Sequence, residues 1–119
     1  MVLYAGATAD AVRIKDNGVT WEQLKDGPGY SYYYSVQGDG TTLYTQHANT
    51  GTTNGNFMDK DLTHSPYIVS HENDGLKWTP YKGGAQTFIN GPFSMRFDPD
   101  NRIMYSANWD AGLWALKVE

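Results

Sequence analysis

Two carboxylates, Asp59 and Asp61, are the residues of this 119-residue chain whose type and spacing come closest to a catalytic pair. Glycoside hydrolases use two carboxylates, one as the acid and the other as the base or nucleophile. Here the two lie in a segment, 49–65, that is rich in Gly, Thr and Asn. Polar clusters of this kind usually form ordinary loops. We therefore interpret the pair as solvated loop charges and assign no catalytic residue to it.

The segment 49–65 is itself longer than most connections, and long connections are commonly functional or disordered. Its Phe57 would either anchor the loop or offer an apolar contact surface. A second interpretation is that the loop binds a sugar, with Phe57 as the stacking face and polar side chains bonding the hydroxyl groups. The polar candidates are Asn49, Asn54, Asn56 and Asp59.

A dense run of aromatic residues spans Tyr30 to Tyr34. If this run is a strand, alternation sends Tyr32 and Tyr34 to one face and Tyr33 to the other. Such residues commonly pack between neighbouring sheets, since aromatic side chains dominate burial in cores. The functional alternative is a platform on which a sugar ring stacks. Trp109, at the end of an expected strand, carries the same two interpretations.

Metal ligation has little support in the sequence. The histidines His47, His64 and His71 would gather only if the strands on either side of segment 49–65 pair, and they lack the spacing of a zinc site. The Asp-Pro-Asp-Asn run at 98–101 has too few ligands for a calcium loop and is typical of a type I turn. We expect no metal and no cofactor.

The composition excludes several partners. A net charge of −4 without a basic run argues against nucleic acid. No apolar stretch approaches the ~18 residues of a transmembrane helix, so we expect no membrane association. The chain has no cysteine, which leaves the compartment open. Thirteen glycines and nine tyrosines suit many tight turns joining short strands.

Ten short strands are expected, and no helix, because no window shows a 3.6-residue apolar period. The expected strands are Val2–Ala7, Ala11–Lys15, Trp21–Leu24, Tyr30–Val36, Thr42–Ala48, Pro66–Glu72, Trp78–Tyr81, Phe93–Phe97, Arg102–Asn108 and Leu113–Val118.

An internal repeat organises these strands. An apolar residue, Tyr and a small residue recur at Leu3–Ala5, Leu43–Thr45 and Met104–Ser106. A gapless match then sets Val12-Arg13 against Leu113-Trp114. Lettering each unit A to D, the chain reads B-C-D, A-B-C-D, A-B-C, over residues of about 2–24, 30–81 and 93–118. Incomplete four-stranded antiparallel units predict an all-β fold, a partial β-propeller.

A turn motif recurs between the C and D strands of the first two units. The clear copy contains Asp16, Gly18, Thr20 and Trp21, and the decayed copy contains Asn73, Gly75 and Trp78. The Asp or Asn oxygen is expected to cap backbone N–H groups, Gly to take a positive φ, and Trp to pack between sheets.

This turn resembles the Asp-box (BNR repeat) of the sialidase-like β-propellers. In that family the box is a structural turn on the rim, so the resemblance implies architecture more than chemistry. Some of these families are glycoside hydrolases, and true sialidases bind a carboxylate with three arginines. Of the three arginines here, Arg13 lies on an outer strand and Arg102 at a turn, so only Arg96 is placed to line a central channel. No sialidase catalytic residue carries over.

The resemblance therefore predicts non-catalytic blades of a secreted, extracellular propeller that binds carbohydrate or acts as a scaffold. The alternative is a C-terminal fragment of an Asp-box glycoside hydrolase or related polysaccharide-active enzyme. About two and a half blades cannot close a ring, since propellers have ~4 to 8. We expect a homo-oligomer, or a second chain that supplies the missing blades. Possible sugar-binding residues are Arg96, Tyr32, Tyr34, Asn54, Asn56, Phe57, Asp59 and Trp109.

Overall fold

The computed structural model describes residues 2–7, 10–24, 33–46, 67–82, 92–108 and 112–119. Every regular element in these ranges is a β-strand, and every pairing is antiparallel. The prediction of an all-β fold is confirmed. Across these ranges, no helix is long and apolar enough to cross a membrane.

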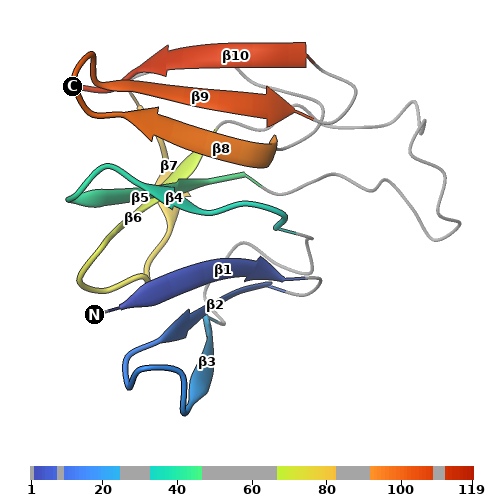
Figure 1. Ribbon diagram of the computed structural model, residues 1–119, viewed down its shortest axis with the longest axis vertical. Coiled ribbons are helices and arrows are strands. Elements are labelled where there is room, and N and C mark those ends of the chain that lie inside the picture. The colour runs from blue at the N-terminus through green and yellow to red at the C-terminus, as the bar shows by residue number, and fades with distance from the viewer. Residues whose placement is uncertain (1, 8–9, 25–32, 47–66, 83–91, 109–111) are drawn as a thin grey trace, which may run out of the picture.

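The strands form three sheets in chain order (Figure 1). The first sheet contains β1 (Leu3–Ala7), β2 (Asp10–Ile14) and β3 (Trp21–Leu24). The second contains β4 (Gln37–Gly38), β5 (Thr42–Thr45), β6 (Ile68–His71) and β7 (Thr79–Pro80). The third contains β8 (Pro92–Asp98), β9 (Ile103–Asn108) and β10 (Gly112–Lys117). Within each sheet, each strand pairs with the next one along the chain.

The sheets lie one above another along the longest dimension of the molecule, 41 Å (Figure 1). The second sheet occupies the middle, with the first on one side and the third on the other. Strands β4 and β8, each the first strand of its sheet, contact each other. The main hydrophobic core lies between the second and third sheets, and its buried members are Tyr44, Tyr67, Met95, Met104 and Val118.

The fourth expected strand is misplaced. Residues 33–36 are not a strand, and the segment that pairs with β5 is β4, at residues that lie between two expected strands. The backbone at Tyr33 crosses so close to the first sheet that a Cβ on Gly6 would clash with the Tyr33 carbonyl oxygen. The carbonyl of Ser35 accepts a hydrogen bond from the Thr45 hydroxyl at 2.7 Å. Residues 33–36 are thus held by a contact with the first sheet and by a hydrogen bond from the Thr45 side chain, and not by pairing with a neighbouring strand.

The gapless match between the first and third units fails in its last strand. Tyr4 pairs with Arg13, whereas Tyr105 pairs with Ala115 and not with Trp114. The connection after β9 joins the pair Asn108 and Gly112, and it is one residue longer than the connection between Ala7 and Asp10. One inserted residue moves every later side chain to the opposite face of the strand.

Candidate functional site

Each sheet has a face that carries the repeated tyrosine, which we call the forward face, and an opposite, backward face. The forward pair on the two neighbouring strands is Tyr4 and Arg13 in the first sheet. The corresponding pairs are Tyr44 with Val69 in the second sheet and Tyr105 with Ala115 in the third.

The forward face of the first sheet packs on the turn between β6 and β7. The Tyr4 hydroxyl donates a hydrogen bond to the Glu72 carbonyl oxygen. The Tyr4 ring lies against Gly75, whose φ is 63° and where a Cβ would be 2.5 Å from a ring carbon. Burial raises the pKa of Tyr4. A glycine is therefore required at position 75 both by the backbone and by the tyrosine above it.

Arg13 joins the same two sheets. The sequence placed it on an outer strand, yet it is 4% exposed. Its Nε donates to Glu22 Oε2 at 2.6 Å, and its Nη1 donates to the Asp74 carbonyl oxygen. The hydrogen bond from Arg13 lowers the pKa of Glu22. A buried guanidinium is tolerable only with such partners, so Arg13 is a structural cation that links two sheets.

The forward face of the second sheet packs on the third sheet. Tyr44 belongs to the hydrophobic cluster with Met104 and Val118, and its hydroxyl donates to Asp39 Oδ2 at 3.2 Å. Burial, with the Asp39 charge as a second cause, raises the pKa of Tyr44. The Asp39 carboxylate also accepts from Arg102 Nη2 at 3.3 Å, which ties the β4–β5 turn to the third sheet.

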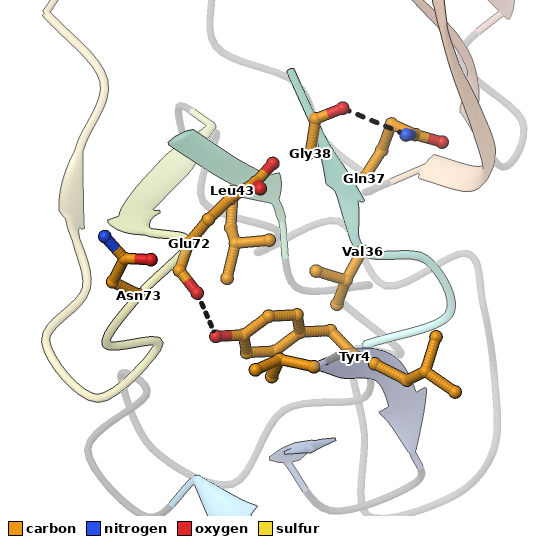
Figure 2. Close-up of a pocket in the computed structure, with 9 residues that line it drawn as sticks. Tyr4, Val36, Gln37, Gly38, Leu43, Glu72 and Asn73 are labelled. Atoms are coloured by element: carbon orange, nitrogen blue, oxygen red, sulfur yellow. Dashed lines mark hydrogen bonds between the residues drawn. The ribbon is translucent and has the colours of Figure 1, made fainter. Parts of the chain in front are cut away.

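A cavity of about 480 Å³ lies where the first sheet meets the second (Figure 2). Figure 2 shows Tyr4 below it, Gln37 and Gly38 above it, and Glu72 and Asn73 at one side. Gln37 Nε2 donates to the Gly38 carbonyl at 3.0 Å, and Glu72 Oε1 accepts from the Gly40 amide at 2.9 Å. Glu72 is the only charged side chain among the described residues of its wall, so this site offers hydrogen bonding and apolar contact but no acid–base pair.

The clear copy of the turn motif has the expected geometry. Asp16 Oδ1 accepts from the amides of Val19 and Thr20 at 3.1 and 2.8 Å, and Gly18 has a φ of 97°. Hydrogen bonds, first of all from the Thr20 side chain, lower the pKa of Asp16.

The decayed copy is built differently. Residues 70–78 lie between the paired Val69 and Thr79, one residue more than the segment 14–21 between Arg13 and Glu22. The carbonyl oxygen of His71 accepts from the amides of Asp74 and Gly75, at 2.9 and 2.8 Å. The expected cap by the Asn73 side chain is therefore replaced by a backbone turn.

The two tryptophans of the motif differ in their surroundings. Trp78 is half-buried, and its Nε1 donates to the Gly75 carbonyl at 3.0 Å. Trp21 is 57% exposed, so it does not pack between sheets within the described part of one chain, as the sequence had led us to expect. The physical reason is its place on the backward face, in register with Leu3 and Ile14, where this chain has no further described sheet.

In the described part of the aromatic run, Tyr33 is buried and Tyr34 is exposed, although residues 33–36 do not form the strand on which the predicted alternation depended. The rings of Tyr34 and Phe93 lie 5.5 Å apart with an interplanar angle of 42°, and their residues are 41% and 56% exposed. The sequence did not single out Phe93. Two exposed aromatic rings in contact form the clearest stacking surface in the described part of the chain.

The three arginines do not converge. Arg102 lies 5.6 Å over the Phe97 ring and bonds Asp39 and the Glu119 carbonyl. Arg96 is exposed on the forward face of the third sheet, opposite Tyr105, whereas Phe97 belongs to the core side. Arg13 is bound between the first and second sheets. No sialidase-like carboxylate grip is formed by these residues.

The remaining predicted residues lie outside the described ranges: Tyr32, Asn49, Asn54, Asn56, Phe57, Asp59, Asp61, Trp109, His47 and His64. Among the described residues, no group of three His, Asp or Glu side chains is placed to hold a metal ion. The Asp98 carboxylate caps its own turn, accepting from the amides of Asp100 and Asn101 at 3.0 and 3.1 Å.

Sequence reasoning missed the roles of Tyr4, Arg13, Asp39 and Glu72 in joining the sheets. The available signal was the repeated Leu3-Tyr4-Ala5 pattern, which aligned strands but was not extended to the face on which its tyrosine lies. The chain matches no protein-family model, no curated protein and no solved structure, so the geometry of its sheets must support any assignment of function.

Proposed function

We propose that this chain supplies non-catalytic blades of a β-propeller that is secreted and either binds carbohydrate or acts as a scaffold, with the ring completed by oligomerisation or by a partner chain. The observation that carries the proposal is the repeated stacking of forward faces. Tyr4 contacts the second sheet, and Tyr44 lies in the core between the second sheet and the third.

The contact of β4 with β8 supports the same arrangement. In a propeller, the four-stranded blades surround a central channel, so the first strands of neighbouring blades approach each other there. Short antiparallel sheets joined in chain order, and the Asp16 turn between β2 and β3, accord with blades of the Asp-box type.

The carbohydrate-binding form has its own support in the Tyr34–Phe93 ring pair. Binding sites combine apolar or aromatic surfaces with a few placed polar groups, and an exposed ring can stack on the apolar face of a sugar. The hydrolase alternative gains no comparable support, since Arg13 is buried between two sheets and forms no common carboxylate site with the exposed Arg96 and Arg102.

A glycan array tests the carbohydrate-binding form. We expect the intact protein to bind at least one glycan class, and Tyr34→Ala and Phe93→Ala each to weaken that binding about tenfold, because each removes half of the stacking surface. Gln37→Ala, in the cavity of Figure 2, is the matched control and should bind normally. No binding above background by the wild type would eliminate the lectin form and leave the scaffold form.

A further inference from the structure

The forward face of the third sheet is exposed, although the equivalent faces of the first and second sheets pack against a neighbouring sheet. Tyr105 occupies the place of Tyr4 and Tyr44 but is 39% exposed, and Leu113, which pairs with Ala107 on the same face, is 76% exposed. Ala107 and Ala115 on the same face are exposed as well. This is a side of the stack that ends without a covering sheet in the described chain.

The backward face of the first sheet, at the other end of the stack, also carries exposed apolar residues. Leu43 and Met104 are buried on the backward faces of the second and third sheets. Leu3, at the matching position of the first sheet, is 47% exposed and Trp21 is 57% exposed, whereas Ile14, which pairs with both, is 4% exposed. Among the described residues, no sheet covers the forward face at one end of the stack or the backward face at the other end.

The first sheet also has a turn at the position that contacts the repeated tyrosine in the other two sheets. Tyr4 rests on the β6–β7 turn at Gly75, and Tyr44 shares a cluster with Val118, directly after β10. Each forward tyrosine therefore lies where the third of the lettered strands ends in the next sheet. In the first sheet this place is the β2–β3 turn at Gly18, where an added Cβ would meet no atom of the described residues within 4 Å.

We propose that the forward face of the third sheet docks on the backward face of the first sheet of a second copy of this chain, with Tyr105 seated on the turn at residues 15–18. The inference rests on the proposed propeller function and names its partner. A second copy is favoured because the contact continues the interface already repeated within the chain and joins two unlike faces. Such head-to-tail contacts form a ring when the rotation closes.

The number of sheets fixes the ring. The described residues of one copy form three sheets, so two copies give six, within the range of about 4 to 8 blades in propellers, and three copies give nine. The expected assembly is a closed dimer with two identical interfaces, of twice the 13.3 kDa of one chain.

Native mass spectrometry on variants of the full chain tests this interface. Leu113→Glu blocks the forward face and Trp21→Glu blocks the backward face, each by placing a carboxylate in an apolar contact. Both variants are expected to be monomers, with a dimer dissociation constant raised about 100-fold or more. Leu76→Glu, an exposed leucine on neither face, is the control and should remain dimeric. Ala115→Glu and Val19→Glu replace either variant if its circular dichroism shows that it does not fold.

Mixing the two blocked variants separates this arrangement from other dimers. A head-to-tail contact predicts that the mixture forms a 1:1 dimer through its one intact interface. A dimer formed by the forward face alone would leave Trp21→Glu dimeric, and that result would overturn the proposal. So would a monomeric wild type, or dimers of both single variants. A monomeric wild type that still binds glycans through Tyr34 and Phe93 would sink this inference alone and leave the proposed function standing.

Discussion

At the scale of single residues, the structure shows that the two copies of the turn motif are stabilised in different ways. Asp16 and Asn73 occupy matching places in two copies of one motif, but only the Asp16 side chain caps its turn. In the second copy a longer loop lets the His71 carbonyl take over. The turn motif therefore does not need a side-chain acceptor at its first polar position where a backbone carbonyl accepts the amide hydrogen bonds instead.

The caps give a matched pair of variants. Asp16→Ala is expected to lower the thermal midpoint, because it leaves the amides of Val19 and Thr20 without their acceptor. Asn73→Ala should leave the midpoint within error, since the turn at His71 is closed by backbone hydrogen bonds. Differential scanning calorimetry of the two proteins decides the point, and equal losses would contradict the assignment.

At the scale of elements, the turn between β6 and β7 serves as a seat for the first sheet. Gly75 and Gly18 both have positive φ, 63° and 97°, but only Gly75 has a ring above it. In the monomeric Leu113→Glu background, where no Tyr105 from a second copy covers this turn, Gly18→Ala should cost about 1–2 kcal/mol from backbone strain alone. Gly75→Ala should cost more, because the Tyr4 ring must also move.

A double-mutant cycle measured by urea unfolding isolates that second contribution. In a Tyr4→Ala background, Gly75→Ala is expected to cost no more than Gly18→Ala does. If Gly75→Ala were equally costly with and without Tyr4, the stacking of the first sheet on this turn would be refuted.

The elements also show what the sequence allows one to predict. Alternation, turn residues and the apolar-Tyr-small repeat located most of the strands closely. They could not locate β4, because residues 33–36 follow a tertiary contact at Gly6 and not a local preference. Register was lost for a related reason. A single added residue before β10, and another before β7, changes which side chains share a face, and nothing in the local pattern marks either insertion.

In the candidate site, the role of a residue depends more on its position relative to a neighbouring sheet than on its residue type. Arg13 and Tyr4 gained their roles from the sheet beside them, which the sequence does not display. Arg96 was correctly placed on the first strand of its sheet, but its contacts depend on what covers the forward face. Six of the possible sugar-binding residues lie outside the described ranges and remain predictions: Tyr32, Asn54, Asn56, Phe57, Asp59 and Trp109.

At the scale of the whole molecule, the core between the second and third sheets is rich in tyrosine. Burial raises the pKa of Tyr44, and burial raises that of Tyr67, whose hydroxyl is hydrogen-bonded to Ser106. Because each folded pKa exceeds the unfolded value of about 10, this stability is fully present below pH ~10 and is lost as the pH rises further.

Alkaline unfolding should therefore depend on these hydroxyls. Tyr67→Phe and Tyr44→Phe are expected to flatten the loss of stability above pH ~10, while Tyr34→Phe, outside the core cluster, should leave the profile unchanged. Urea unfolding at several pH values from about 8 to 11.5 measures the slope. An unchanged slope in both core variants would show that ionisation of these tyrosines does not open the core.

The three sheets stack through equivalent faces, and we propose that the stack continues into a second copy of the chain. The mass of the wild-type chain in solution is the decisive quantity, measured by light scattering over a range of concentrations. We expect a stable species of twice 13.3 kDa with β-sheet circular dichroism. A folded species of 13.3 kDa at every concentration would contradict this arrangement, since the open faces around Tyr105 and Leu3 would then be stable without a partner.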